Sequence, residues 1–137
     1  MFSSCQTIDG YYYSLEKARN EKGLYKDADY VFSEHLDDAV IDFIIKENAL
    51  HIVQIGVKGR GDTSKYRVRY TSSYLLDQAI SEYNNAGDYV WSETSKLSLK
   101  KISWCVVSKE FNKNNNLCAF DFIYNETSYL LCYDIVD

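Results

Sequence analysis

The chain contains no proline, only six glycines among its 137 residues, and one methionine. It also lacks an internal repeat, a low-complexity tract and a recognisable linker. The absence of proline favours a compact fold over a linker-rich chain. We therefore expect a single globular domain spanning residues 1–137, long enough to bury a core without metal or disulfide crosslinks.

Other absences limit where the protein works. No apolar run approaches the length of a membrane-spanning helix, and residues 1–10 lack the basic and apolar regions of a secretory signal. We expect a cytoplasmic protein without membrane contact, and no ligand pattern predicts a metal or another cofactor. Cys5, Cys105, Cys118 and Cys132 form no CxxC pair, so we expect reduced thiols that serve mainly as small buried hydrophobic residues.

What the chain does contain is apolar and aromatic. Hydrophobic residues make up 46% and aromatic residues 15% of the chain, with 13 tyrosines, so a disordered chain is excluded. The formal net charge is -5 and the sequence pI is about 5.0. This balance argues against general affinity for nucleic acid and is compatible with a basic protein partner.

Local patterns predict an α+β domain. We expect an antiparallel β-sheet of about five to six strands packed with two to three α-helices. Ser14 is a suitable N-cap for a short helix that ends near Gly23, and longer amphipathic helices are predicted at 33–48 and 73–87. The predicted strands lie at 49–58 and 65–71, which form a hairpin, and near 88–94, 99–108, 117–125 and 128–136.

The segment SEHLDDAVIDFIIKEN, residues 33–48, is the strongest predicted helix. A helical wheel gathers Leu36, Val40, Phe43 and Ile44 on one face and the carboxylates on the other, with Ile41 and Ile45 inside the acidic arc. One interpretation is that the helix packs on two sides. Two singly exposed isoleucines are another, and a protein-binding surface is the third.

Apolar anchors ringed by carboxylates are typical of a binding hot spot with a polar rim. On this basis we expect a non-enzymatic inhibitor of a basic protein, such as an immunity protein against a nuclease toxin or a phage anti-defence inhibitor. Exposed tyrosines would extend the surface. The predicted partner-binding residues are Glu34, Asp37, Asp38, Ile41, Asp42 and Ile45, with Tyr11, Tyr12 and Tyr13 as a second group.

The alternative hypothesis is a nucleic-acid-binding module. In KYRVRYT, Lys65, Arg67 and Arg69 alternate with Tyr66, Val68 and Tyr70, so the cations share one strand face. Cations and tyrosines together are typical of binding by charge and stacking. The predicted nucleic-acid-binding residues are Lys58, Arg60, Lys65, Arg67 and Arg69. The non-functional interpretation is a solvated outer face, or one that pairs with the protein's own acids. A structural or assembly subunit is a third hypothesis.

A degenerate nuclease is a variant of this alternative. HIVQIGVKGRG is similar to the strand of PD-(D/E)xK nucleases, in which an acid or glutamine stands two residues before the lysine. Here Gly56 occupies that position before Lys58, and Gln54 lies two residues further back, so the motif is broken. A metal site would require Asp38 or Asp42 to join Gln54 and Lys58.

Overall fold

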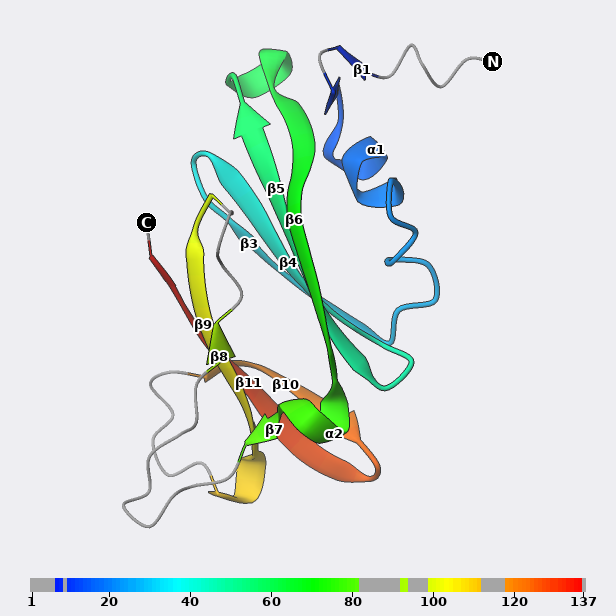
Figure 1. Ribbon diagram of the computed structural model, residues 1–137, viewed down its shortest axis with the longest axis vertical. Helices are drawn as coiled ribbons and strands as arrows, with labels where there is room; N and C mark the ends of the chain where they lie inside the picture. Colours follow the sequence, from blue (N-terminus) through cyan, green and yellow to red (C-terminus); the bar gives the residue numbers. More distant parts are fainter. Residues whose placement is uncertain (1–6, 9, 82–91, 94–98, 112–117, 137) are drawn as a thin grey trace. The chain divides into compact units, whose positions relative to one another are not determined.

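The computed structural model of the chain describes residues 7–8, 10–81, 92–93, 99–111 and 118–136 (Figure 1). The chain divides into two compact units, and we describe each by itself. Met1–Glu47 and His51–Ser72 form unit 1, and Asn48–Leu50 and Ser73–Asp137 form unit 2. None of the helices within the described ranges has the length and apolar character that a membrane crossing requires.

A six-stranded sheet with the strand order β1-β2-β6-β5-β4-β3 carries most of unit 1 (Figure 1). Its strands are β1 (Thr7–Ile8), β2 (Tyr11–Tyr12), β3 (Tyr30–His35), β4 (Ala39–Lys46), β5 (Ala49–Lys58) and β6 (Lys65–Leu75). The prediction of a hairpin at 49–58 and 65–71 is confirmed, because β5 and β6 are neighbours joined by a short turn containing the 3-10 helix η2 (Gly61–Thr63).

Helix α1 (Leu15–Asn20) precedes β3 and begins as predicted. The Ser14 side chain accepts a hydrogen bond from the backbone N–H of Lys17, which satisfies one of the free donors at a helix N-terminus. Just beyond the helix, Gly23 adopts a φ of 66° and its N–H donates to the carbonyl of Asn20. The end of this helix near Gly23 is therefore confirmed.

The predicted helix at 33–48 is wrong, because this segment forms most of the hairpin β3–β4. Its first turn is closed by the Leu36 N–H, which donates to the carbonyl of Ala39 over 2.8 Å and leaves Asp37 and Asp38 at the tip. Residues 33–48 end in the turn between β4 and β5, where Glu47 and Asn48 have φ values of 51° and 64°. Two successive positive φ values fit a type I′ turn, which matches the twist of a hairpin.

The misprediction has a physical cause in the burial of β4. From Ala39 to Ile45 every residue of β4 is buried, so apolar residues appear on both faces of the strand and the alternation typical of a half-exposed strand is lost. Because Asp42 interrupts the apolar residues of this strand, their spacing resembles that of an amphipathic helix. The β-branched residues Val40, Ile41, Ile44 and Ile45 nevertheless suit a strand.

One face of this sheet holds a core cluster of unit 1. Its buried members are Ala18, Val40, Ile44, Val53 and Ile55. Since side chains alternate along a strand, Val40 and Ile44 lie on the same face of β4 as Asp42, and Val53 and Ile55 lie on the face of β5 opposite to Gln54. Tyr12, Tyr66 and Val68 pack against the cluster from β2 and β6. Helix α1 is held on this face through Ala18.

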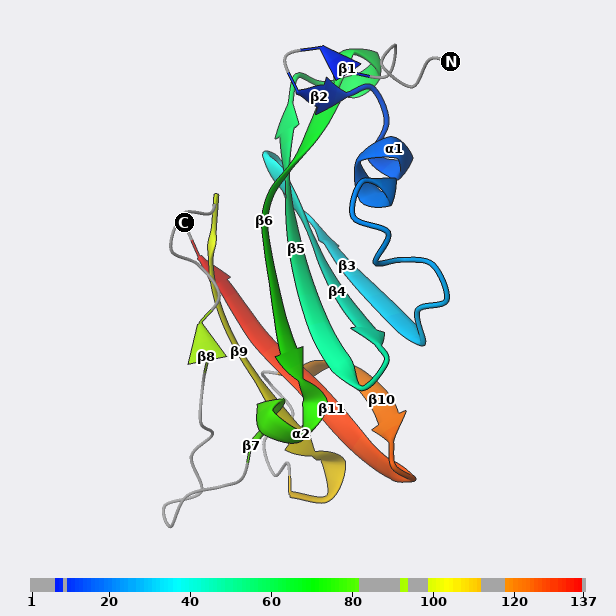
Figure 2. The same cartoon turned by 45° about the vertical axis from the view of Figure 1, so that its right-hand side comes forward.

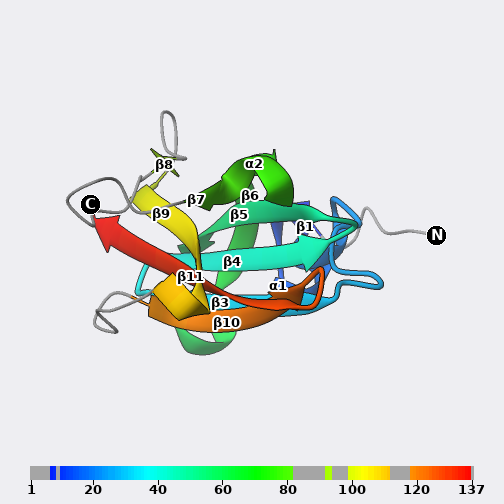
Figure 3. The same cartoon turned by 90° about the horizontal axis from the view of Figure 1, so that it is seen from below.

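Unit 2 contains a five-stranded sheet (Figure 3). Its strand order is β10-β11-β9-β7, and β8 also pairs with β9. The elements are β7 (Ile80–Ser81), β8 (Ser92–Glu93), β9 (Lys101–Ser108), β10 (Cys118–Tyr124) and β11 (Thr127–Val136), with α2 (Leu76–Ala79) and the 3-10 helix η3 (Lys109–Phe111). The pairing of β7 with β9 is parallel, and the other pairings given for this sheet are antiparallel.

The expectation of an α+β fold is met only in coarse form. Strands dominate, and the α-helices in the described ranges are the short α1 and α2. The predicted helix at 73–87 is wrong for most of its described part. Only Leu76–Ala79 is helical, as α2, because β6 continues to Leu75 and β7 begins at Ile80. Residues 82–87 lie outside the described residues. The strands predicted near 99–108, 117–125 and 128–136 are confirmed as β9, β10 and β11.

The turn between β5 and β6 allows a matched test of backbone strain. Gly59 has a φ of 89°, and a Cβ at this position would lie 2.7 Å from the carbonyl oxygen of Thr63. Gly61 has a φ of 54° and no neighbouring atom within 4 Å of such a Cβ. Gly59→Ala is therefore expected to lower the free energy of unfolding by about 2 kcal/mol or more, and Gly61→Ala by about 1 kcal/mol, in urea denaturation. Equal losses would show that the Thr63 carbonyl moves away at no cost.

Candidate functional site

The predicted partner-binding surface on an acidic helix does not form. Ile41 and Asp42 are 0% exposed and Ile45 is 3% exposed, so all three are buried within this chain. Asp37 and Asp38 remain exposed at the β3–β4 tip, and Glu34 is half-buried in β3. A surface with isoleucine anchors inside a carboxylate ring is therefore absent from residues 33–48. The two-sided packing that we considered for Ile41 and Ile45 is the arrangement observed, in a strand rather than a helix.

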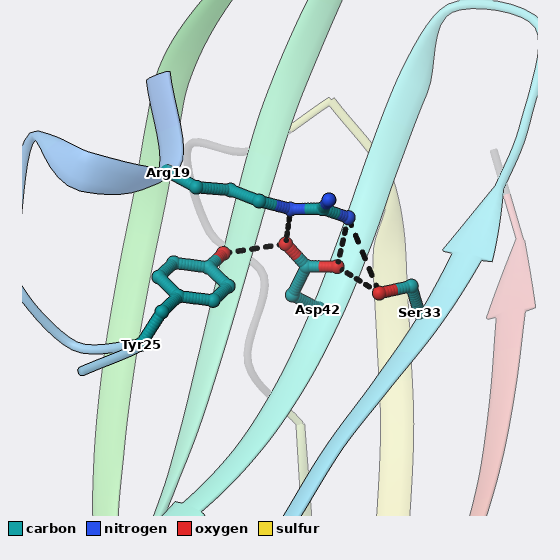
Figure 4. Close-up of polar contacts among 4 residues, drawn as sticks. All are labelled: Arg19, Tyr25, Ser33 and Asp42. Atoms are coloured by element: carbon teal, nitrogen blue, oxygen red, sulfur yellow. Dashed lines mark hydrogen bonds and ion pairs between the residues drawn. The ribbon is translucent and has the colours of Figure 1, made fainter. Parts of the chain in front are cut away.

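Asp42 instead stands at the centre of a polar network on the α1 side of the sheet (Figure 4). Arg19 of α1 donates from Nε to Asp42 Oδ2 over 2.8 Å and from Nη2 to Oδ1 over 3.0 Å. The hydroxyl of Tyr25 donates to Oδ2 and that of Ser33 donates to Oδ1, each over 2.5 Å. The Asp42 carboxylate thus has four donors, two on each oxygen, which compensates for its removal from water.

The electrostatics of this network are those of a structural ion pair. Burial acts to lower the pKa of Arg19, but the hydrogen bonds and charge of Asp42 outweigh it and raise that pKa overall. Burial and the adjacent Asp42 carboxylate raise the pKa of the Tyr25 hydroxyl. Both groups keep their protons at neutral pH. Since every acceptor site of Asp42 faces a protein donor, the network fastens α1 and the following segment to β3 and β4, and it offers no open position to a ligand.

The arrangement required for a PD-(D/E)xK metal site is not present. Asp42 lies on the core face of the sheet and is held by Arg19, whereas Gln54 is buried on the opposite face of β5. Lys58 is exposed at the end of β5. Among the described residues no cluster of three or more histidine, cysteine or acidic side chains could hold a metal ion. The geometry therefore does not support the nuclease variant of the alternative hypothesis.

The cations of the predicted basic hairpin do come together, and they meet at Tyr11. Strands β2 and β6 are neighbours in the sheet (Figure 2), and their antiparallel pairing sets Tyr12 opposite Tyr66. The next pair in this register is Tyr11 with Arg67. Side chains of three cations surround the Tyr11 ring. The distances to its centroid are 5.6 Å from Lys58 Nζ, 5.6 Å from Arg67 Cζ and 5.5 Å from Arg69 Cζ. We call Tyr11, Lys58, Arg67 and Arg69 the Tyr11 cluster.

The alternation predicted for residues 65–70 explains how this cluster forms. Tyr66 and Val68 pack on the core, as their spacing predicted, so Arg67 and Arg69 project from the other face of β6 and are exposed. Tyr12 packs on the same core and Tyr11, its neighbour in β2, therefore lies on the cationic face. Gly10, next to Tyr11, has a φ of 83° and lies beside the Arg67 guanidinium, 3.6 Å from where its Cβ would be.

Among the described residues, no acid neutralises the charges of the cluster. No ion pair joins Lys58, Arg67 or Arg69 to a carboxylate in the part of the chain that the structure describes. No two of these cations can be further apart than about 11 Å, which is twice their distance of 5.6 Å from the shared ring centroid. At that separation two unit charges in water repel by about 0.4 kcal/mol, and by more when closer. A cation–π contact at an exposed site contributes about 0.5–1 kcal/mol, so the ring offsets this repulsion.

Of the other predicted site residues, two lie near the Tyr11 cluster and one makes no cation–π contact with its described cations. Lys65 precedes Arg67 on the same face of β6 and is half-buried, and Arg60 is exposed in the β5–β6 turn. Tyr13 is 47% exposed and makes no cation–π contact with described cations. The sequence pattern groups Tyr11 with a different surface, the predicted acidic one. Only the pairing of β2 with β6 shows that it belongs with the cations.

The expectation of reduced thiols is met at Cys105 and is wrong at Cys132. Cys132 of β11 is disulfide-bonded, which corrects that expectation. Cys105 of β9 is a free, buried cysteine and belongs to a small cluster with Val107 and Cys132. Burial raises the pKa of the Cys105 thiol to about 12, so the thiol stays protonated at neutral pH and behaves as an apolar core residue. The expected burial of Cys105 and Cys132 is confirmed.

Comparison with known proteins adds no family. No protein-family model matches the chain, and comparisons with curated proteins and with solved structures give no significant match. The Tyr11 cluster and its chemistry are therefore the basis for a proposed function.

Proposed function

We propose that this chain is a non-enzymatic binding module that holds single-stranded nucleic acid on the Tyr11 cluster. The observation that carries the proposal is the convergence of three cations from β5 and β6 around one tyrosine, with no ion pair to a described carboxylate. Cations that keep their charge free attract phosphate and release counterions when they bind it.

The size and shape of the cluster favour a single strand. Its cations span at most about 11 Å, a distance that covers only a few successive phosphates, and each of the three cations can contact one of them. The cations project from a sheet face, and a basic surface that follows the backbone is common in single-strand binding.

The negative net charge of the whole chain is compatible with nucleic-acid binding at a local group of cations. A net charge of -5 repels phosphate everywhere except where cations gather without compensation. Binding is therefore confined to the Tyr11 cluster, with Lys65 and Arg60 beside it. It is also weak at high salt, because few contacts contribute and each one is screened.

The salt dependence of binding tests the proposal. A fluorescently labelled 12-mer of deoxythymidine is titrated with the protein between 50 and 200 mM salt and followed by anisotropy. Three phosphate contacts predict a slope of about -2 for log K against log [salt], so affinity falls about 20-fold over this range. The same strand in a duplex is titrated as the comparison, because it presents the same phosphates on a rigid helix. The absence of binding to the single strand at 50 mM salt would refute the proposed function.

A further inference from the structure

We propose that Tyr11 is a positioning residue that holds Lys58, Arg67 and Arg69 together as one site for the phosphodiester backbone, and that it is not a platform for base stacking. This inference rests on the proposed function and specifies its ligand chemistry. The module would recognise the backbone of a single strand independently of its bases.

The surroundings of Tyr11 support a positioning role. Three cationic groups lie within 5.6 Å of its ring centroid, where the negative ring face attracts positive charge. A ring has only two faces, so a base that stacked on Tyr11 would have to displace cations that already contact it. Stacking platforms for single strands are aromatic side chains that present a free face.

The Tyr11 hydroxyl is also engaged. It accepts a hydrogen bond from Arg69 Nη2 over 2.5 Å, which orients this guanidinium. The same ring thus contacts a lysine at the end of β5 and two arginines of β6, which otherwise have long side chains free to spread into solvent. A guanidinium carries five donors in a planar fork, and those not used by Tyr11 remain available to phosphate oxygens.

The neighbouring backbone completes the arrangement. Gly10, with a φ of 83°, adjoins Tyr11 and lies against the Arg67 guanidinium without a side chain between them. A side chain at this position would stand in ordinary contact with Arg67, 3.6 Å from its Cζ and Nε atoms, and would cover part of the cation. Glycine therefore adds no side chain of its own over this side of Arg67.

The test compares Tyr11→Leu, Tyr11→Phe and the control Tyr13→Leu, which changes an exposed neighbouring tyrosine outside the cluster. Each is titrated with the deoxythymidine 12-mer, with an abasic 12-mer that has the same phosphates, and with inorganic tripolyphosphate. Thermal unfolding of each variant checks the fold. We expect the wild-type protein to bind both 12-mers within about threefold of each other, since its contacts are with phosphates.

Tyr11→Leu is expected to weaken binding of all three ligands about 5- to 10-fold, through loss of the cation–π contacts. Tyr11→Phe keeps the ring and should retain affinity within about threefold, and Tyr13→Leu should bind like the wild-type protein. Loss of affinity for the thymidine strand alone, with abasic binding unchanged, would overturn the inference in favour of stacking. An unchanged affinity of Tyr11→Leu for every ligand would also overturn it.

The tripolyphosphate titration separates this inference from the proposed function. If the protein binds tripolyphosphate in a Tyr11-dependent way but binds neither 12-mer, the positioning role of Tyr11 stands and the nucleic-acid function fails. If the wild-type protein binds none of the three ligands, both fail.

Discussion

Replacing Lys58, Arg67 and Arg69 together by glutamine is expected to weaken binding of the deoxythymidine 12-mer by about 100-fold or more at 50 mM salt. Each phosphate contact on a single strand contributes about 0.7 to the salt slope, so the slope should fall from about -2 towards zero as the three contacts are lost. Fluorescence anisotropy at several salt concentrations measures both quantities. Because the three side chains are exposed, the variant should keep its fold.

A matched variant controls for the change in net charge. Lys17, Lys22 and Lys26 are also exposed, lie in α1 and the segment that follows it, and are outside the Tyr11 cluster. Changing all three to glutamine alters the net charge equally. If this control loses as much affinity as the cluster variant, binding follows overall charge and the Tyr11 cluster is not the site.

Asp42→Asn is expected to destabilise the protein by about 2–4 kcal/mol. The substitution keeps the size of the side chain but removes the negative charge that Arg19 faces, while two hydroxyls also lose a charged acceptor. Breaking a buried ion pair by removing one partner usually costs about 3–5 kcal/mol. The estimate here is lower because the Arg19 side chain is 25% exposed and can reach water. Urea denaturation followed by circular dichroism measures the loss.

The double variant R19M/D42N shows whether the loss arises from an unpaired charge. With Arg19 replaced by an apolar side chain, no charge is left without a partner, so the double variant should be more stable than Asp42→Asn alone. Simple addition of the two single losses would contradict the coupling between Arg19 and Asp42. Asp42 lies on the core face of the sheet and the Tyr11 cluster lies on the other face. These substitutions are therefore expected to change stability and not the binding residues.

Local signals in the sequence predicted part of the fold correctly. The bounds of β5, the alternation of residues 65–70, the Ser14 N-cap and the strands β9 to β11 depend on neighbouring residues along the chain. Asn125 and Glu126, in the turn between β10 and β11, have φ values of 50° and 65°, and asparagine is among the residues that adopt such positive φ values most readily. These features arise from side-chain alternation, capping and turn chemistry, which act over a few residues.

The segment at 33–48 could not be predicted in the same way. The spacing of its apolar residues depends on whether one or both faces of β4 are buried. The number of buried faces is set by the packing of the whole unit. The same packing decided the role of Asp42. In sequence it is one of several carboxylates, whereas in the structure Arg19, Tyr25 and Ser33 enclose it.

The sequence by itself determined that the chain has a substantial apolar core, that Arg67 and Arg69 share a strand face, and that Lys58 ends the preceding strand. Tertiary structure alone decided which residues complete the two polar sites. Tyr11 joins cations more than 45 positions away because β2 pairs with β6, and Asp42 meets Arg19 because α1 packs on the sheet. Such contacts depend on strand pairing and packing between distant segments, and no short-range pattern in the chain encodes them.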